Sequence, residues 1–434
     1  MGWDFETDAE FQTELDWIDE FVREEIEPLD FIVKSPYDIK DPIRAEIIPP
    51  LQKLVQDRKL WACHLGPDLG GPGYGQMKLA LMNEILGRAR SASTVFGTQA
   101  PDTGNSEILA HFGTDEQKER FLYPLLRNEI VSCYSMTEPQ GGADPAVFQT
   151  TAVLDGNEWV INGEKWFSSN ARHAEFFIVM VVTDPDNDLV RSQSQFLVPA
   201  DTPGIELVRN VGIGYQSESE DEGSHGYLRY NDVRVPAENL LGERGGGFAV
   251  SQVRLGGGRI HHAMRTIGRV QRVFDMMCER ALSRTTKGET LGRKQMVQEM
   301  IADSWIELEM FRLLVLRTAW KIDKLQDYRL VRKDISAVKA AMPGVYRNVA
   351  SRALQVHGSL GVSWEMPFAK EVIESFHMGL ADGPTEVHKV QVARRVLDEY
   401  VPCDDLFPSS HLPKRRAAAE AKYADVLERH LQTQ

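Results

Sequence analysis

Residues near position 382 could support acid–base or metal chemistry. Asp382, Glu386 and His388 occur within one short segment. A carboxylate can remove a proton as a general base, and two carboxylates with a histidine could also bind a metal ion. A satisfactory metal geometry is hard to reach at this spacing, so we predict no metal site. A simpler alternative is that Asp382 only caps a turn before Gly383.

Other patterns that could carry chemistry are missing or weak. The sequence contains neither GxxxxGK[ST] nor a GxGxxG motif after a predicted strand, so it predicts no P-loop or Rossmann nucleotide site. The glycine-rich segments 242–248 and 254–259 favour plain turns. His261, His262 and His377 are most simply explained as residues of a helical bundle or of the surface.

The charge balance argues against general binding to nucleic acid or to anionic lipid. The 434 residues include 49 Lys and Arg against 64 Asp and Glu, which gives a formal net charge of −15. A protein of this charge repels polyanions, so any anionic ligand must meet a local basic site. Hydrophobic residues make up 42% of the chain, which is typical of a folded globular protein.

The cysteines and the apolar runs predict a cytoplasmic protein without a membrane span. Cys63, Cys133, Cys278 and Cys403 are scattered without CxxC spacing, which favours free thiols in a reducing compartment. The acidic first residues carry no apolar segment typical of a secretory or transit signal. The longest apolar run, at 176–182, is too short to cross a bilayer.

Periodicity of apolar residues predicts a mainly α protein with a central β domain. Helical spacing recurs in residues 10–29, 76–89 and 114–126, the last behind a Thr114 cap. Between about 135 and 245 short β-rich runs alternate with turn residues, and Asp155-Gly156-Asn157 predicts a hairpin. Long helical patterns return after about 246.

These patterns divide the chain into four predicted parts. They are an N-terminal helical domain (1–134), a small antiparallel β-barrel (135–245), a C-terminal four-helix bundle (246–400) and a tail (401–434) formed by one exposed helix.

Four segments of distinctive composition follow one another along this layout. They are TEPQGGAD at 137–144, NGEKWFSSN at 162–170, the spaced set Arg284, Gly288, Leu291 and Gln295, and the stretch from Gln355 to Pro384 that contains Ala381-Asp382-Gly383. Together they resemble motifs of the acyl-CoA dehydrogenase family over nearly the whole chain. Segments such as APDTGN and LADGPTEVH are most similar to the subgroup that is fused to a phosphotransferase-like domain in animals.

This resemblance implies a bound FAD and the α,β-desaturation of a fatty acyl-CoA thioester. Asp382 occupies the position of the family's usual glutamate, so it would remove the α-proton while the β-hydrogen leaves as hydride to flavin N5. The backbone N–H of Asp382 would stabilise the charge that develops on the thioester carbonyl. An electron-transferring flavoprotein would accept the electrons, and the chain would form a homodimer or homotetramer.

The resemblance also assigns binding residues position by position. The residues matched to FAD contacts are Tyr134, Met136, Thr137, Gly142, Ala143, Phe167, Ser168, Ser169, Arg284, Gln295, Gln355, Val356, His357, Gly358, Ser359, Pro384, Thr385 and Glu386. The residues matched to substrate contacts are Gly258, Arg259, Ala381 and Gly383. Arg284 and Gln295 match residues that reach the FAD of a neighbouring subunit.

Asp382 is the only carboxylate at either position where the family places its base. Some relatives carry the base just before the arginine matched by Arg259, but Gly258 stands there. Aspartate is shorter than glutamate by about 1.5 Å, so backbone or substrate must lie closer. Burial beside an acyl chain is expected to raise the pKa of Asp382. The small Ala381 and Gly258 suggest room for substrates that are bulky near the thioester, or a backbone that closes inward.

Several departures and alternatives accompany this interpretation. Ala143 replaces a family serine, Lys287 replaces a phenylalanine, and Ile373-Glu374 replace Arg-Asp, which affects the expected FAD contacts. A flavin oxidase on the same fold, either acyl-CoA oxidase or similar to nitroalkane oxidase, is an alternative because fold does not decide the reaction. A third hypothesis is a binding or assembly protein that has kept the fold.

Overall fold

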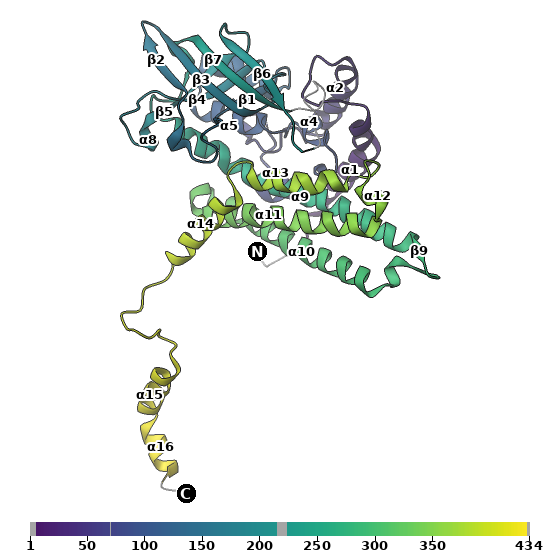
Figure 1. Ribbon diagram of the computed structural model, residues 1–434, viewed down its shortest axis with the longest axis vertical. Helices are drawn as coiled ribbons and strands as arrows, with labels where there is room; N and C mark the ends of the chain where they lie inside the picture. Colours follow the sequence, from purple (N-terminus) through teal and green to yellow (C-terminus); the bar gives the residue numbers. More distant parts are fainter. Residues whose placement is uncertain (1–5, 70, 215–223, 432–434) are drawn as a thin grey trace. The chain divides into compact units, whose positions relative to one another are not determined.

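The computed structural model describes residues 6–69, 71–214 and 224–431 (Figure 1). Internal packing separates the chain into two units, residues 1–389 and residues 390–434. The site lies within the first unit. The second unit contains α15 (Leu412–Lys422) and α16 (Ala424–Leu431), so the predicted single tail helix is interrupted at Tyr423.

The N-terminal part is helical, as the sequence predicts. Its helices are α1 (Ala9–Phe21), α2 (Pro42–Asp57), α3 (Gly75–Leu86), α4 (Ala92–Val95), α5 (Asp102–Phe112), α6 (Asp115–Gln117) and α7 (Tyr123–Leu126). The apolar face of α1 is buried through Phe11, Leu15, Ile18 and Phe21. The Thr114 cap is confirmed, since Gln117 N donates a hydrogen bond to Thr114 Oγ1 (3.2 Å).

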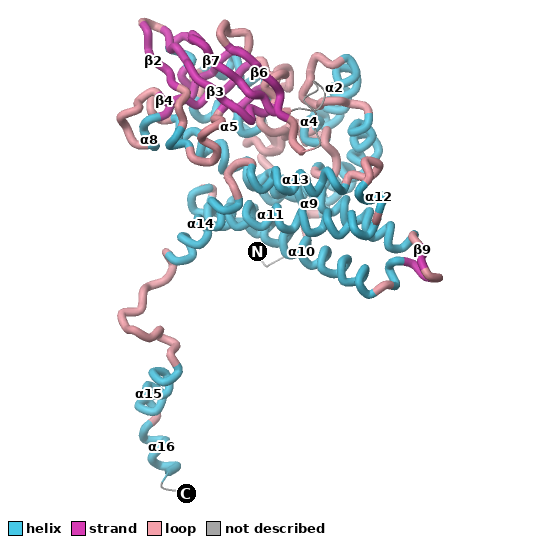
Figure 2. The backbone as a smooth tube through the Cα atoms, viewed as in Figure 1, coloured by secondary structure: helices cyan, strands magenta, loops and turns pink. Residues whose placement is uncertain are grey.

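The strands gather in the middle of the sequence, apart from a small hairpin (Figure 2). They are β1 (Ser132–Ser135), β2 (Thr151–Asp155), β3 (Glu158–Ser169), β4 (Phe176–Val182), β5 (Gln193–Pro199), β6 (Ile205–Val211), β7 (His225–Pro236) and β8 (Leu240–Leu241). Their order is β6-β7-β3-β2-β4-β5-β8, with β1 beside β4. The predicted hairpin is confirmed, because Asp155 pairs with Glu158 across Gly156-Asn157.

The sheet is mostly antiparallel, as predicted, but it contains two parallel pairings that the sequence did not indicate. Strand β4 pairs in parallel with β1 and, at Thr151–Val182, with β2. Parallel neighbours need a long connection, and residues 136–175, which include the β2–β3 hairpin, supply it between β1 and β4. Alternation of apolar residues does not reveal strand direction, so sequence patterning could not show this.

Four helices pack together in the C-terminal part (Figure 1). They are α9 (Gly247–Ser283), α10 (Gln295–Leu325), α11 (Tyr328–His357) and α13 (Phe368–Leu380), with α12 (Ser359–Val362) before α13 and α14 (Thr385–Leu397) after it. The short strands β9 (Thr285–Thr286) and β10 (Glu289–Thr290) connect α9 to α10.

Helix α9 runs straight through the glycine-rich segment 254–259, for which the sequence predicted a turn. A side chain at these glycines would meet neighbouring groups. A Cβ at Gly257 would lie 3.1 Å from Glu107 Oε2, and one at Gly258 would lie 3.2 Å from Asp382 Oδ2. Close packing against other elements therefore outweighs the low helix propensity of glycine.

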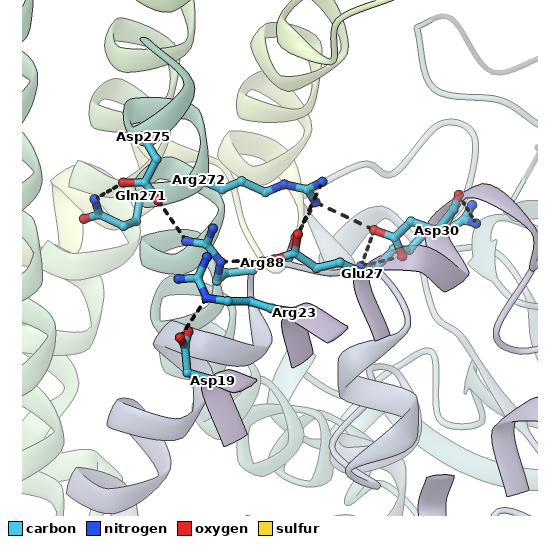
Figure 3. A network of polar contacts seen from close by, with 9 residues as sticks. Asp19, Arg23, Glu27, Asp30, Arg88, Gln271, Arg272 and Asp275 are labelled. Atoms are coloured by element: carbon cyan, nitrogen blue, oxygen red, sulfur yellow. Dashed lines mark hydrogen bonds and ion pairs between the residues drawn. The ribbon is translucent and has the colours of Figure 1, made fainter. Parts of the chain in front are cut away.

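Ion pairs connect α9 to the N-terminal part (Figure 3). Arg88 contacts Glu27 (Nε–Oε1, 3.2 Å) and Asp275 of α9 (Nη1–Oδ2, 3.0 Å). Arg272, also on α9, lies 3.9 Å from carboxylate oxygens of both Glu27 and Asp30. Arginines on this face of α9 thus have carboxylate partners.

Candidate active site

A cavity of about 320 Å³ lies between the β domain, α5, α9 and the end of α13. Asp382 and Gly258 line it together with Ser169 and His225 of the β domain. This volume lies at the lower end of the range typical of small-molecule sites. The predicted base, one predicted flavin contact and two predicted substrate contacts, Gly258 and Ala381, therefore face the same space.

The backbone at Asp382 has an unusual conformation that is held from two sides. Asp382 has φ +55° and Gly383 has φ +103°. Arg259 Nε donates a hydrogen bond to the carbonyl oxygen of Asp382 (2.9 Å), and His388 Nε2 lies 3.3 Å from the same oxygen. Aspartate is one of the few side chains that tolerate the left-handed region. Arg259 and His388 therefore fix the direction in which residue 382 presents its carboxylate.

The carboxylate of Asp382 lies against α9. His262 Nε2 is 3.4 Å from Asp382 Oδ2. Burial raises the pKa of Asp382, but His262, Arg254, Arg259 and Lys339 outweigh it and hold the pKa below its ordinary value. In the ligand-free protein the neighbouring groups therefore lower the pKa, and the raised pKa expected beside a bound acyl chain stays a prediction.

His262 was assigned no chemical role from the sequence, yet it contacts the predicted base. Burial lowers the pKa of His262, while the carboxylate of Asp382 opposes this, so the protonation of the two side chains is linked. Its position could have been noticed, because His262 follows Arg259 by three residues and helical neighbours at that spacing share a face. His377, assigned to bundle or surface, also lines the cavity and lies 3.4 Å from Glu374.

Residues of the β domain offer features that fit a flat polar cofactor. Ser169 Oγ lies 2.9 Å from His225 Nδ1, while His225 Nε2 and Asn170 Nδ2 are buried without a hydrogen-bond partner among the described residues. The Phe167 ring is 39% exposed, on a residue with φ +51°. Gly142, in the predicted flavin loop, has open space where a side chain would be. The free ring and amide nitrogens of His225 and Asn170, next to an exposed aromatic ring, could form hydrogen bonds with the polar edge of an isoalloxazine ring.

The TEP segment is held by a buried ion pair. Lys165 Nζ contacts Glu138 Oε1 (2.8 Å) and donates to the carbonyl oxygen of Met136 (2.7 Å). Glu138 also accepts hydrogen bonds from the backbone N–H groups of Gln149 (2.6 Å) and Thr150 (2.9 Å). This glutamate therefore fastens the predicted flavin loop to β3, a structural role that the motif alone did not reveal.

Some predicted cofactor residues have side chains engaged in other contacts. Ser168 is fully buried and its Oγ lies 3.1 Å from Ser135 Oγ. Tyr134 is buried, and its hydroxyl accepts a hydrogen bond from Gln195 Nε2 (2.9 Å). The carbonyl oxygen of Thr137 accepts a hydrogen bond from Trp166 N (2.9 Å), and Ala143 is exposed. The Ser168 and Tyr134 side chains therefore support the loop from the interior.

Another group of predicted cofactor residues lies at the opposite end of the bundle (Figure 1). Arg284 is exposed and follows Gly258 by about 26 residues of α9, which corresponds to roughly 40 Å. Gln295, exposed, begins α10 near the same end. Residues 355–359 lie before α13, whereas Asp382 lies after that 13-residue helix. One chain therefore does not bring Arg284 and Asp382 to the same ligand.

The segment 355–359 contains both exposed and buried residues. Gln355, Gly358 and Ser359 are exposed, whereas Val356 and His357 are buried. His357 Nδ1 lies 2.8 Å from the carbonyl oxygen of Ala353, and its ring packs against Phe368. The exposed members are the ones available to a ligand, and the buried members hold the end of α11.

The residues next to Asp382 differ in exposure. Ala381 lines the cavity, and a Cβ at Gly383 would lie 3.0 Å from His388 Nε2. Thr385 Oγ1 donates a hydrogen bond to the carbonyl oxygen of Gly379 (3.2 Å), Pro384 is partly buried, and Glu386 is exposed. Within residues 6–69, 71–214 and 224–431, no group of three or more His, Cys, Asp or Glu side chains is arranged to bind a metal.

None of the described helices combines the length and the apolar character that crossing a membrane requires.

Comparison with known proteins gives one consistent family. Models of the acyl-CoA dehydrogenase N-terminal, middle and C-terminal domains match residues 8–129, 133–233 and 245–397. The presumed acyl-CoA dehydrogenase FadE2 of Mycobacterium tuberculosis is 40% identical over 81% of this chain and 86% of its own length.

A second relative is longer. Acyl-CoA dehydrogenase family member 11 of Rattus norvegicus is 39% identical over 81% of this chain, which spans only 45% of that protein. A solved structure of a presumed acyl-CoA dehydrogenase from Mycobacterium abscessus is 36% identical, with a TM-score of 0.83, covering 92% of this chain and 100% of that one. The chain therefore belongs to the acyl-CoA dehydrogenase family.

Proposed function

We propose that the chain is an FAD-dependent acyl-CoA dehydrogenase with Asp382 as the base. The observation that carries this proposal is the carboxylate of Asp382 in a cavity that Ser169 and His225 also line. The neighbouring charged groups hold the pKa of Asp382 below its ordinary value, which favours the ionised form. A flavin bound on that wall would accept the β-hydrogen of the acyl chain as hydride. Family membership supports an oxidoreductase that acts on a CH–CH group.

Asp382 would take the α-proton of the acyl thioester onto its carboxylate. His262 contacts this carboxylate and Arg259 holds the backbone carbonyl of the same residue, so the two contacts limit its movement. Gly258 leaves the space in front of Oδ2 open, since a side chain there would meet that oxygen. The geometry therefore orients the base without filling the place of the substrate.

The α-carbon is a weak acid, so the charge that forms on the thioester oxygen needs a donor. No backbone or side-chain acceptor among the described residues takes the N–H of Asp382. This N–H is therefore available to the thioester carbonyl, in the role that the resemblance implies. The same residue would then contribute both the base and one stabilising donor.

The rate of flavin reduction by acyl-CoA is expected to stay constant from about pH 8 down to about pH 5. A carboxyl group whose pKa lies below its ordinary value remains ionised above that value, so proton abstraction is lost only as the pH falls through the lowered pKa. The measurement is stopped-flow reduction at substrate concentrations well below saturation, where the rate reports the pKa of the free enzyme. A rate that titrates with a single pKa inside the range would contradict the lowered pKa of Asp382.

Arg284 and Gln295 support a shared cofactor site in an oligomer. Arg284 lies roughly 40 Å along α9 from Gly258, which adjoins Asp382, and Gln295 begins α10 near the same end, so both would contact the FAD of a neighbouring subunit. Arg284→Ala is expected to weaken FAD retention roughly tenfold or more, because a charged hydrogen bond to a phosphate is lost. The ratio of FAD to protein after gel filtration measures this, with the exposed neighbour Arg293→Ala as control.

A homodimer or homotetramer is part of this proposal. A monomer that holds one FAD per chain would contradict both the shared site and the role of Arg284. Three expectations from the sequence stay predictions. They are the electron-transferring flavoprotein as electron acceptor, the similarity to the subgroup with the phosphotransferase-like domain, and the cytoplasmic location.

The proposed reaction is tested by anaerobic flavin bleaching. The purified protein is mixed with a panel of acyl-CoA esters, and the flavin absorbance is followed. Bleaching, followed by reoxidation with an electron-transferring flavoprotein, supports the dehydrogenase. Fast reoxidation by air alone would instead support the flavin oxidase. Protein without a yellow cofactor, or with one that no ester reduces, would contradict the proposed function.

A further inference from the structure

Arg265 is a charged side chain in the cavity with no carboxylate partner among the described residues. It projects from α9 and lines the same cavity as Asp382. Among the described residues its only hydrogen bond is a long one, from Nη1 to the carbonyl oxygen of Thr98 (3.4 Å). Within this described part of the chain no carboxylate oxygen lies within 4.0 Å of its guanidinium.

The other basic residues of this region have stronger partners. Arg269 pairs with Glu374 (Nη1–Oε1, 3.1 Å), and Arg254 donates from Nε to Asn105 Oδ1 (2.8 Å). Arg259 donates to the backbone of Asp382. Further along α9, Arg272 belongs to the ion-pair network of Figure 3. Among the described residues, Arg265 is therefore the cavity-lining arginine of α9 with the weakest polar contact.

Arg265 keeps its positive charge despite this environment. Burial lowers the pKa of its guanidinium to about 10, which still leaves it protonated at pH 7. A charge that is withdrawn from water without a partner is costly. No described carboxylate pairs directly with Arg265, although the charge of Asp382 raises its pKa, so a ligand that enters the cavity can supply the direct partner.

Helix geometry places Arg265 beyond the reacting end of the substrate. Arg265 follows Gly258, which adjoins the Asp382 carboxylate, by two helical turns, or roughly 10 Å along the axis. Side chains on a helix lean towards its N-terminus, so the guanidinium leans back towards Gly258. A cavity of about 320 Å³ accommodates an acyl chain but not the nucleotide and the long arm of coenzyme A. The anion near Arg265 therefore belongs to the acyl chain.

We infer that this enzyme acts on acyl-CoA esters whose acyl chain carries its own anionic group, and that Arg265 binds that group. The inference rests on the proposed acyl-CoA dehydrogenase function and names its substrate class. A carboxylate on a short chain is the group tested, because a guanidinium binds a carboxylate through paired hydrogen bonds. Glu374 does not compete for Arg265, because Arg269 and His377 already contact it.

The test compares esters that differ only in the carboxylate. Glutaryl-CoA is paired with pentanoyl-CoA, and adipoyl-CoA with hexanoyl-CoA, in anaerobic flavin reduction by the holoenzyme. The wild type is expected to prefer the carboxylated member of at least one pair. Arg265→Gln should reduce that preference roughly 10- to 100-fold, which is the range of a charged hydrogen bond. Arg265→Lys should restore part of it.

Arg272→Gln is the matched control, because it removes an arginine from the same helix outside the cavity. It should leave the preference unchanged. If Arg265→Gln slows both members of each pair equally, Arg265 acts on coenzyme A or on the fold, and the inference is wrong. If the wild type shows no preference in either pair, the inference is also wrong.

Binding measurements separate failure of this inference from failure of the proposed function. Calorimetric titration of the holoenzyme with each ester gives an affinity ratio for each pair that does not depend on flavin reduction. If no ester bleaches the flavin, the proposed reaction is wrong. The affinity ratio, and its loss in Arg265→Gln, then still decides whether Arg265 binds an anionic acyl chain.

Discussion

Asp382→Asn is expected to retain its flavin and to slow flavin reduction by acyl-CoA roughly 10²–10⁴-fold, the usual contribution of a general base. Asparagine has nearly the same shape and also tolerates the left-handed backbone at φ +55°, so the loop and the cavity should keep their form. The amide cannot accept the α-proton at neutral pH. Anaerobic stopped-flow reduction, together with the flavin content of the purified variant, measures the effect.

Two further observations complete this test. Asp16→Asn removes an exposed carboxylate from α1 and should leave the rate unchanged. Reduction of Asp382→Asn at close to the wild-type rate would show that another group removes the proton. Loss of flavin from Asp382→Asn would instead point to a structural role for this residue, in agreement with the alternative that it caps a turn.

Glu138→Ala is expected to lower the free energy of unfolding by about 3–5 kcal/mol, because it leaves Lys165 charged and buried without its partner. Both side chains are at most 1% exposed, and Lys165 Nζ lies 2.8 Å from Glu138 Oε1. The backbone N–H groups of Gln149 and Thr150 would also lose their acceptor. Urea denaturation of the two proteins measures the difference.

Strand β3 itself provides the control for this prediction. Glu158 pairs with Arg234 at 3.3 Å, with both side chains about half exposed. Glu158→Ala should therefore cost about 1 kcal/mol or less. An equal cost for the two variants would show that the Glu138–Lys165 pair is no stronger than a surface pair. A combined Glu138→Gln and Lys165→Met variant should recover part of the loss, because it removes the stranded charge.

The sequence predicted the positions of helices and strands more accurately than the way in which they pair and pack. The period of apolar residues identified α1 and the bundle helices, and turn residues identified the hairpin at Gly156. The parallel pairing of β4 was missed, because strand direction depends on how the chain returns to the sheet. The helical course of segment 254–259 was missed, because glycine favours turns until a neighbour packs against it.

In the candidate site, too, the sequence identified a motif residue but not the residues that packing brings next to it. Asp382 could be named from its motif, and the structure brings it to the cavity together with Gly258 and Ser169. His262 and Arg265 carried no motif, and their importance depends on which face of α9 turns towards the cavity. An amphipathic sequence pattern does not distinguish a polar residue that contacts a buried group from one on the surface. The packing of the helices is needed to identify the buried contact.

The left-handed backbone at Asp382 has a consequence for how this position can change. Where the family usually places glutamate, this chain has a shorter acid in a conformation that aspartate and asparagine adopt far more readily than longer side chains. A change from aspartate to glutamate would therefore alter the turn as well as the reach. Replacing aspartate by glutamate here would require compensating changes in Arg259 and His388, which hold the turn. A relative with glutamate at this position is therefore expected to differ at several of these sites together.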